Sequence, residues 1–246
     1  MPSRETEAII LKTFPLGEAD RLVSFLGRSS GKLRGVAAGA RRIKNRFGST
    51  LELLSHVQIW YVERETRDLV RIQQCELLES FHRAQSDYAL TTGLAAVSEI
   101  AERVLPERET AESSFRLILL AAREVERRGD WRLPLAYFAY WTVRLGGWLP
   151  PLDTCSKCGG KLGSAIAYDW SSGPGLFCAN CRRTGMQPLP LESRRLAERF
   201  AAAGLDKLEL TAEEDNAARS LQEAALNWIE FHTERKLITR ELLETV

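Results

Sequence analysis

The sequence has little net charge and few of the residues from which most catalytic sites are built. It contains only three histidines and five cysteines, and its 34 basic residues are balanced by 33 acidic ones, for a net charge of +1. The overall charge therefore indicates no anionic partner, and such a signal must come from a local segment. We find no nucleophile elbow and no pair of histidines at helical spacing. We therefore expect a protein that is not an enzyme.

Long apolar runs are also absent. Near the N-terminus the only apolar stretch is Ala-Ile-Ile-Leu at residues 8–11, which is too short for the core of a signal peptide. Nothing approaches the length of about 20 residues that crosses a bilayer. The 44% hydrophobic and 27% charged residues are typical of a soluble globular protein. Few cysteines outside metal spacing fit a reducing compartment, so we expect a cytoplasmic protein without a membrane partner.

Four of the five cysteines form two Cys-x-x-Cys pairs, Cys155 with Cys158 and Cys178 with Cys181, with nineteen residues between the pairs. This spacing is typical of a four-thiolate zinc site. A gap of two residues lets one tight turn direct both sulfurs at the same ion, and four thiolates close a tetrahedral shell without an open position for substrate. The pattern predicts one structural Zn²⁺ per chain. The alternative is four reduced or disulfide-bonded cysteines.

The residues around the cysteines predict a zinc ribbon. Gly159 and Gly160 follow the first pair, where a knuckle turn often needs a positive φ that glycine adopts without steric cost. Residues 165–170 alternate like a strand, residues 171–175 read as a turn, and Leu176 leads back toward the second pair.

The N-terminal third of the chain has the pattern of a small β-barrel. Runs rich in Val, Ile, Leu and aromatic residues predict strands at residues 6–14, 19–27, 32–38, 53–62 and 69–79. Five strands with short connections and one longer excursion favour the OB-fold over an SH3-like barrel. We expect the fifth cysteine, Cys75, to be a small core residue of this barrel.

The rest of the chain has the period of α-helices. Apolar stripes predict helices at residues 90–104, 115–125 and 134–145, the last apolar on nearly every side and therefore buried. After the cysteines, a capping box at Thr211 and Glu214 opens a long helix with Leu221, Trp228 and Phe231 on one face. The expected class is thus α+β with several domains. Its parts are an OB-fold domain (1–80), a helical domain (81–152 and 187–246) and an inserted zinc ribbon (153–186).

A strongly basic segment spans residues 28–46. It holds seven basic residues and no acidic one within nineteen positions. The seven are Arg28, Lys32, Arg34, Arg41, Arg42, Lys44 and Arg46. Such residues neutralise phosphates and release counterions, and a cationic loop on an OB barrel is a common way to hold single strands. We expect these seven residues to bind DNA, although a merely solvated loop is the alternative.

Two further patterns near this segment are weaker evidence of function. Phe47, Trp60 and Tyr61 could stack on bases, but strand alternation places Trp60 and Tyr61 on opposite faces, so at most one of that pair is exposed. Residues 27–33 imitate a phosphate-binding loop, yet one spacer residue is missing and Leu33 stands where Ser or Thr must hold Mg²⁺. We expect no nucleotide hydrolysis from this segment.

Taken together, these motifs resemble the RecO family of bacterial recombination mediators. The resemblance rests on the N-terminal barrel, the run from Gly39 to Phe47, the helical body, the four cysteines, and the closing residues 235–243. It spans nearly the whole chain. It implies an N-terminal OB-fold, a mainly helical C-terminal domain and a structural zinc.

The resemblance also implies a function in DNA repair and recombination, in the RecFOR pathway. Family members bind single- and double-stranded DNA, anneal complementary strands and, with RecR as partner, help to load RecA onto DNA coated by single-stranded DNA-binding protein. The acidic tail of that protein contacts the helical domain in the family, but no particular position of this sequence can be matched to the contact. Some family members lack the cysteines, so the zinc is implied only because all four are present.

Two other functions remain open at this point. A zinc-ribbon DNA-joining enzyme would also combine OB and zinc modules, but its nucleotidyl-acceptor motif, Lys-x-Asp-Gly, is absent from the sequence. Alternatively, the basic segment could make the protein an adaptor that binds an acidic protein tail.

Overall fold

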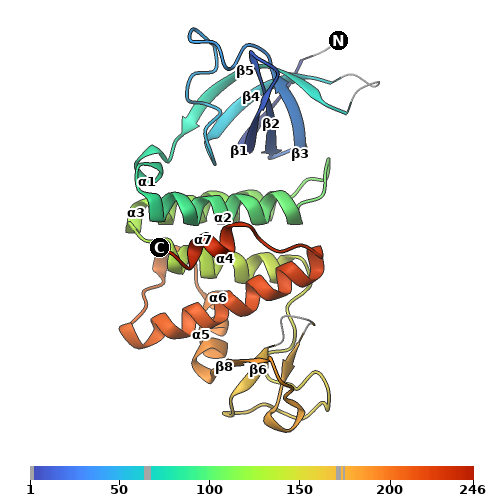
Figure 1. Ribbon diagram of the computed structural model, residues 1–246, viewed down its shortest axis with the longest axis vertical. Helices are drawn as coiled ribbons and strands as arrows, with labels where there is room; N and C mark the ends of the chain where they lie inside the picture. The colour runs from blue at the N-terminus through green and yellow to red at the C-terminus, as the bar shows by residue number, and fades with distance from the viewer. Residues whose placement is uncertain (1–2, 64–67, 170–172, 174) are drawn as a thin grey trace.

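The computed structural model describes residues 3–63, 68–169, 173 and 175–246. A β-barrel lies at one end, a layered helical body in the middle, and a small β-sheet at the other end (Figure 1). No helix among the described residues is long and apolar enough to span a bilayer.

The barrel contains the five expected strands. They are β1 (Arg4–Leu16), β2 (Asp20–Gly27), β3 (Gly31–Ala37), β4 (His56–Val62) and β5 (Val70–Glu79). The order around the closed barrel is β1-β2-β3-β5-β4, with β1 returning to β4. Only β3 and β5 pair in parallel, and the other neighbours are antiparallel. This arrangement confirms the OB-type barrel.

One strand boundary was predicted too early. The run from residue 53 was expected to be extended, but β4 begins at His56. Leu54 has a φ of 57°, in the left-handed region that a strand cannot accommodate. Its backbone N–H instead donates to the Ile10 carbonyl at 2.8 Å, which fixes the turn against β1.

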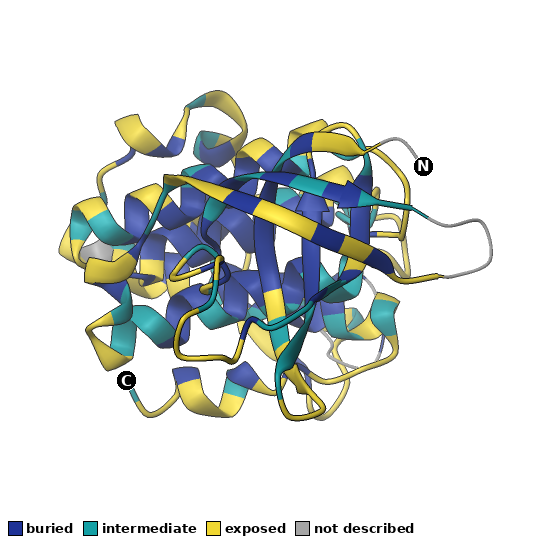
Figure 2. Cartoon of the chain, turned by 90° about the horizontal axis from the view of Figure 1, so that it is seen from above, coloured by how far each residue is buried: buried dark blue, intermediate teal, exposed yellow. Residues whose placement is uncertain are grey.

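The barrel interior is filled by apolar residues. Figure 2, seen from the barrel end, shows buried positions along its strands. Phe25 and Tyr61 meet edge to face inside it, with ring centroids 5.9 Å apart. Cys75 is 6% exposed, as expected for a core residue. Burial raises the pKa of its thiol to about 12, so it stays protonated and packs as a small apolar group.

Residues 27–33, the phosphate-loop look-alike, run from the end of β2 through a tight turn at residues 28–30 into β3. Gly31 has a φ of 72°, and a Cβ there would lie 2.3 Å from the Glu109 carbonyl oxygen. The glycine is thus explained by the turn and by the close approach of another backbone segment. The chain continues into a strand and not into the helix that a phosphate-binding loop requires.

The helical body is built around α4. Its helices are α1 (His82–Gln85), α2 (Tyr88–Val104), α3 (Glu112–Arg128), α4 (Arg132–Leu145), α5 (Leu191–Ala202), α6 (Ala212–Thr233) and α7 (Thr239–Leu243), with a 3₁₀ turn at Leu205–Lys207. Helix α4 packs against α2, α3, α5 and α6. Its aromatic residues Tyr137, Phe138 and Tyr140 are at most 5% exposed, which confirms that they are core residues.

Helix α6 brings the C-terminal part of the chain back onto α4. The predicted capping box at its start is present, and the Glu214 carboxylate accepts the Thr211 backbone N–H at 3.0 Å. Leu221 and Trp228 are fully buried, but Phe231, expected on the same face, is 39% exposed. Phe231 lies three residues after Trp228, so its side chain is rotated by about 60° around the helix axis and lies at the edge of the apolar stripe.

The barrel and the helices share one core. Ile9, Leu11 and Leu26, which point out of the barrel, are buried in the same cluster as α2, α3, α4 and α6. At this junction the Lys32 ammonium donates to the Glu102 carbonyl at 2.5 Å, in the last turn of α2. The negative end of the helix dipole and the free carbonyls there favour a cation. Burial lowers the pKa of Lys32, opposed by the Glu102 and Glu107 carboxylates.

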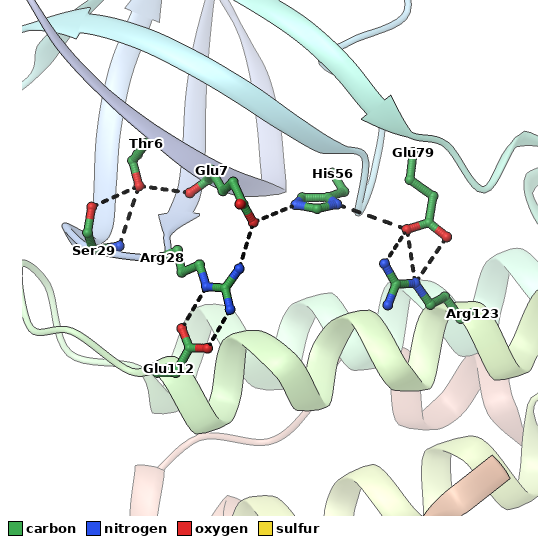
Figure 3. Close-up of polar contacts among 8 residues, drawn as sticks. All are labelled: Thr6, Glu7, Arg28, Ser29, His56, Glu79, Glu112 and Arg123. Carbon is green, nitrogen blue, oxygen red and sulfur yellow. Dashed lines mark hydrogen bonds and ion pairs between the residues drawn. The ribbon is translucent and has the colours of Figure 1, made fainter.

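Ion pairs line one edge of the junction (Figure 3). Arg28 on the β2–β3 turn donates to Glu112 of α3 at 2.8 and 3.0 Å and to Glu7 of β1 at 3.0 Å. Farther along, Arg123 of α3 donates to Glu79 of β5 at 2.7 Å. Arg28 and Arg123 remain about half exposed, so these contacts orient the two parts more than they stabilise them.

The two kinds of junction contact predict different stability losses. We expect Lys32→Met, which keeps the apolar stem but removes the ammonium, to lower the free energy of unfolding by about 1–3 kcal/mol, because a charged hydrogen bond to a carbonyl in the last turn of α2 is lost. Arg123→Ala, the control, should cost less than about 1 kcal/mol because its ion pair is solvated. Urea unfolding followed by circular dichroism measures both. Equal losses would contradict the role assigned to Lys32.

Candidate functional site

The structure brings the four predicted cysteines together. The Sγ atoms of Cys155, Cys158, Cys178 and Cys181 all lie within 4.8 Å of one another. The Cys158 and Cys178 sulfurs are 3.8 Å apart. A tetrahedral Zn²⁺ with bonds of about 2.3 Å separates its sulfurs by about 3.8 Å. The donor set therefore fits a closed tetrahedral metal site.

Each cysteine pair sits on a short turn of the kind that the spacing predicted. In the first turn Gly159 has a φ of 71°, and its N–H donates to the Cys155 carbonyl at 2.9 Å. The second pair lies at the 3₁₀ turn Ala179–Cys181, where the Cys181 N–H donates to the Cys178 carbonyl at 2.9 Å. Both turns point their sulfurs at the same place.

The backbone around the sulfurs favours a thiolate. Burial alone would raise the pKa of Cys155, but N–H groups of Cys158, Cys178 and Lys157 outweigh it and lower the pKa to about 6. The N–H of Cys178 lies 3.4 Å from the Cys155 sulfur. For Cys181, burial and hydrogen bonds among the thiols raise the pKa to about 12. Four such thiols cannot all ionise without a cation between them.

A small antiparallel sheet supports the cysteine cluster. Its strands are β6 (Ala167–Asp169), β7 (Leu176–Phe177) and β8 (Gln187–Leu189), in the order β7-β6-β8. The predicted hairpin is therefore present as β6 and β7, while its expected tip falls partly at residues 170–172 and 174, outside the described residues. The third strand, β8, was not predicted and lies just after residue 186.

Two buried charged residues tie this ribbon to the helices. The Asp169 carboxylate at the end of β6 accepts from the Trp228 indole at 2.7 Å and from the Asn227 amide at 2.8 Å. Arg194 of α5 is 5% exposed and donates to three carbonyls at the base of the ribbon. Sequence reasoning missed both residues, because α5 carries several charged residues and nothing in the sequence distinguishes the buried Arg194 from the exposed ones, or gives Asp169 a distant partner.

The seven basic residues of 28–46 do not form one surface. Arg28 and Lys32 are used at the barrel–helix junction, where Lys32 is only 5% exposed. Arg34 is half exposed and pairs with Glu107 at 3.1 Å. The segment lacks carboxylates in the sequence, but α2, α3 and β1 supply them in space. The structure therefore separates these three residues from the remaining four.

Arg41, Arg42, Lys44 and Arg46 are exposed together on the loop between β3 and β4. None of the four takes part in an ion pair among the described residues. The Arg41 guanidinium donates to the Gly17 carbonyl at 2.6 Å, and its cation remains exposed. This loop, residues 38–50, is named the basic loop below.

The basic loop is ordered by its own hydrogen bonds. The Asn45 side chain accepts the N–H groups of Phe47 and Gly48, both at 2.9 Å. The Gly39 N–H donates to the Asp20 carboxylate at 2.8 Å, which holds the loop beside the β1–β2 turn. Phe47 is buried in the barrel core and anchors the far side. The four cations thus sit on a fixed platform.

The aromatic candidates near the loop are mostly buried. Phe47 and Tyr61 are at most 2% exposed, so neither can stack on a base. Trp60 is partly exposed, as alternation predicted, and its indole donates to Glu5 at 2.7 Å. Of the three candidates, Trp60 is therefore the one whose ring remains accessible.

The histidines have structural partners. His56 lies between the Glu7 and Glu79 carboxylates, 3.4 and 4.0 Å away, at the barrel–helix junction. His232 stacks on Trp148 with ring centroids 4.9 Å apart, and burial lowers its pKa.

Comparison with known proteins covers the whole of this architecture. The family model "Recombination protein O N terminal" matches residues 1–81, and "Recombination protein O C terminal" matches residues 85–241. The DNA repair protein RecO of Koribacter versatilis is 36% identical over 241 residues, which cover 98% of each chain. Those of Syntrophobacter fumaroxidans and a Nocardioides species are each 32% identical, over 99% and 97% of this chain and 98% of theirs. Because the two family models together match residues 1–81 and 85–241, and these relatives align over nearly the whole chain, the chain belongs to the RecO family of DNA repair proteins.

Proposed function

We propose that this protein is a non-enzymatic recombination mediator that binds single- and double-stranded DNA through its barrel. In this function it anneals complementary strands and, together with RecR, assists the loading of RecA in the cytoplasm, at the nucleoid. The observation that carries the proposal is the basic loop, whose four cations are ordered, exposed and free of carboxylate partners among the described residues. Membership of a DNA repair family supports it.

The basic loop is the principal DNA contact in this proposal. Arg41, Arg42, Lys44 and Arg46 can each approach a phosphate without first leaving an acidic partner. Arg28 and Arg34 are exposed, but they would have to exchange their ion pairs with Glu112 and Glu107 for phosphates. They therefore contribute less. We place Lys32 outside the contact, because its ammonium is held by α2.

We further propose that the cysteine cluster holds one structural Zn²⁺. The four-thiolate set and the sulfur separation support zinc, and four protein ligands leave no position for a substrate. The metal would fix the two turns of the ribbon, which Asp169 and Arg194 join to α6 and α5. The domains we propose are an OB-fold domain (1–80) and a helical domain in two segments (81–152 and 187–246) around a ribbon (153–186), with β8 at the start of the second segment completing the ribbon's sheet.

A second candidate function is an adaptor whose basic loop binds an acidic protein tail, such as that of single-stranded DNA-binding protein. The same exposed cations favour it, because they complement carboxylates as well as phosphates. Competition tests whether DNA and the acidic peptide share the basic loop. If they do, an oligonucleotide displaces a labelled acidic peptide; if they bind at different places, it does not. DNA binding that survives removal of the loop cations while peptide binding is lost would favour the adaptor.

The zinc proposal predicts one zinc per chain in the purified protein. Cys178→Ser should lose the metal and lower the free energy of unfolding by several kcal/mol, on the order of a structural site's contribution, because metal binding is coupled to folding. Cys75→Ala is the control, since this cysteine lies in the barrel core, and should keep the metal. Metal analysis and thermal melting measure both effects. Well-folded wild-type protein without metal would contradict the assignment.

The DNA proposal predicts a change in salt dependence. The logarithm of the affinity for single strands should fall linearly with the logarithm of salt concentration, by about 0.7 per neutralised phosphate. Replacing both Arg42 and Lys44 with alanine should flatten this slope by about 1.4 and weaken binding equally for different base sequences. Fluorescence anisotropy at several salt concentrations measures the slope.

The matched control removes two exposed cations from the helical body, Arg195 and Lys207. This variant has the same net charge as the loop variant and should keep the wild-type slope. If the loop variant melts normally and retains the wild-type affinity and slope, the basic loop is not the DNA contact.

A further inference from the structure

A row of side chains crosses the outer face of the barrel through four of its strands. Phe14 of β1 is directly opposite Leu22 of β2, Leu22 is opposite Val36 of β3, and Val36 is opposite Arg71 of β5. Residues paired in this way point to the same side of a sheet. Their neighbour Val23 is fully buried in the barrel core, so the row points outward.

Only part of this outer face is covered by helices. Toward α2 the same face carries Leu26, which is 1% exposed in the shared core, and Ser24, whose hydroxyl donates to Glu102 at 2.6 Å. Beyond them the protein leaves the row open: Phe14 is 43% exposed, and Leu22 and Val36 are partly exposed. In Figure 1 the helices lie beneath one end of the barrel only. An aromatic ring thus stands on an uncovered sheet surface.

Basic residues surround the open row. The Lys12 ammonium lies 4.8 Å from the centre of the Phe14 ring, and Arg71 is exposed at the other end of the row. Neither forms an ion pair with any residue in the described ranges, 3–63, 68–169, 173 and 175–246. The bond from Arg41 to the Gly17 carbonyl places the basic loop against the turn that follows β1. The row and the basic loop therefore meet at the same end of the barrel.

We propose that Phe14, with Leu22 and Val36 beside it, is a stacking platform for unpaired nucleobases and gives the protein a preference for single strands. The inference rests on the proposed DNA binding and adds that the barrel contacts the bases of the DNA as well as its phosphates. Every base has an apolar face that stacks on an aromatic ring, whereas bases within a duplex are already stacked on each other. Lys12, Arg71 and the basic loop are placed to hold the phosphates on either side.

The test compares ligands that differ in bases and in pairing. The probe is a labelled oligothymidine of about 16 nucleotides, the upper end of the site size of an OB-fold. A duplex of equal length presents phosphates with paired bases, and an abasic strand of equal length presents phosphates without bases. The wild-type protein should bind the oligothymidine more tightly than the abasic strand.

Phe14→Ala should weaken binding of the oligothymidine by about tenfold or more, the order contributed by stacking of one base. Its salt slope should stay unchanged, because no charge is removed. Its affinity for the abasic strand and for the duplex should stay at the wild-type level. Phe14→Trp should restore the affinity for the oligothymidine, while Phe14→Leu, which is apolar but not aromatic, should not.

The control is Tyr88→Ala, which removes another exposed aromatic ring, 64% exposed, at the start of α2. It should leave all three affinities unchanged. If Phe14→Ala binds the oligothymidine like the wild type while binding remains salt-dependent, the platform is wrong and the proposed function stands. If the wild type binds no DNA at low salt, both fail. Equal losses of affinity of Phe14→Ala for all three ligands would likewise overturn the platform, because they would indicate a general folding defect. Thermal melting of this variant and of Phe14→Leu would reveal such a defect.

Discussion

The packing of β1 and β2 on the helical body is the contact on which the arrangement of this protein depends. Ile9, Leu11 and Leu26 point out of the barrel and are buried among the helices, so the two parts have one continuous apolar core and not a hydrated interface. Burial on this scale dominates the energetics, while the ion pairs at the rim, such as Arg28 with Glu112, fix the orientation. Because one end of the outer barrel face is used in this way, the basic loop and the Phe14 row are left at the other end.

The ribbon is held by a second, smaller set of contacts. Helix α4 precedes the ribbon in sequence, α5 and α6 follow it, and both pack on α4 in space, so the ribbon is an excursion from a single helical core. At its base the buried Asp169 and Arg194 have their hydrogen-bonding groups largely used by indole, amide and carbonyl partners. A buried charge without such partners would destabilise the fold by several kcal/mol. The cysteine cluster is thus built at the far end of a rigid connection, well away from the barrel (Figure 1).

Charge in this protein is organised by space more than by sequence. The segment 28–46 reads as uniformly basic, but carboxylates from other elements neutralise Arg28 and Arg34, and Lys32 is used as a cap for α2. What remains is a compact set of four cations on one ordered loop. In the proposed function, these exposed cations and the open aromatic ring beside them supply the two components that single-strand binding needs, one for phosphates and one for bases.

The sequence by itself determined the class of fold, the five strands, the principal helices and the cysteine cluster, because each depends on local signals: alternation, helical period, capping and the Cys-x-x-Cys spacing. It also determined that Cys75 and the aromatic residues of α4 are core residues. Only the tertiary structure decided which basic residues of segment 28–46 lack carboxylate partners among the described residues and that Leu54 lies in a turn. It also decided that β8 joins the ribbon and that Asp169 and Arg194 anchor it. The same holds for Phe14, whose place beside Leu22 and Val36 follows from strand register. These features depend on contacts between residues far apart in the chain, such as Lys32 with Glu102 or Asp169 with Trp228, and no local pattern specifies which distant partner a side chain meets.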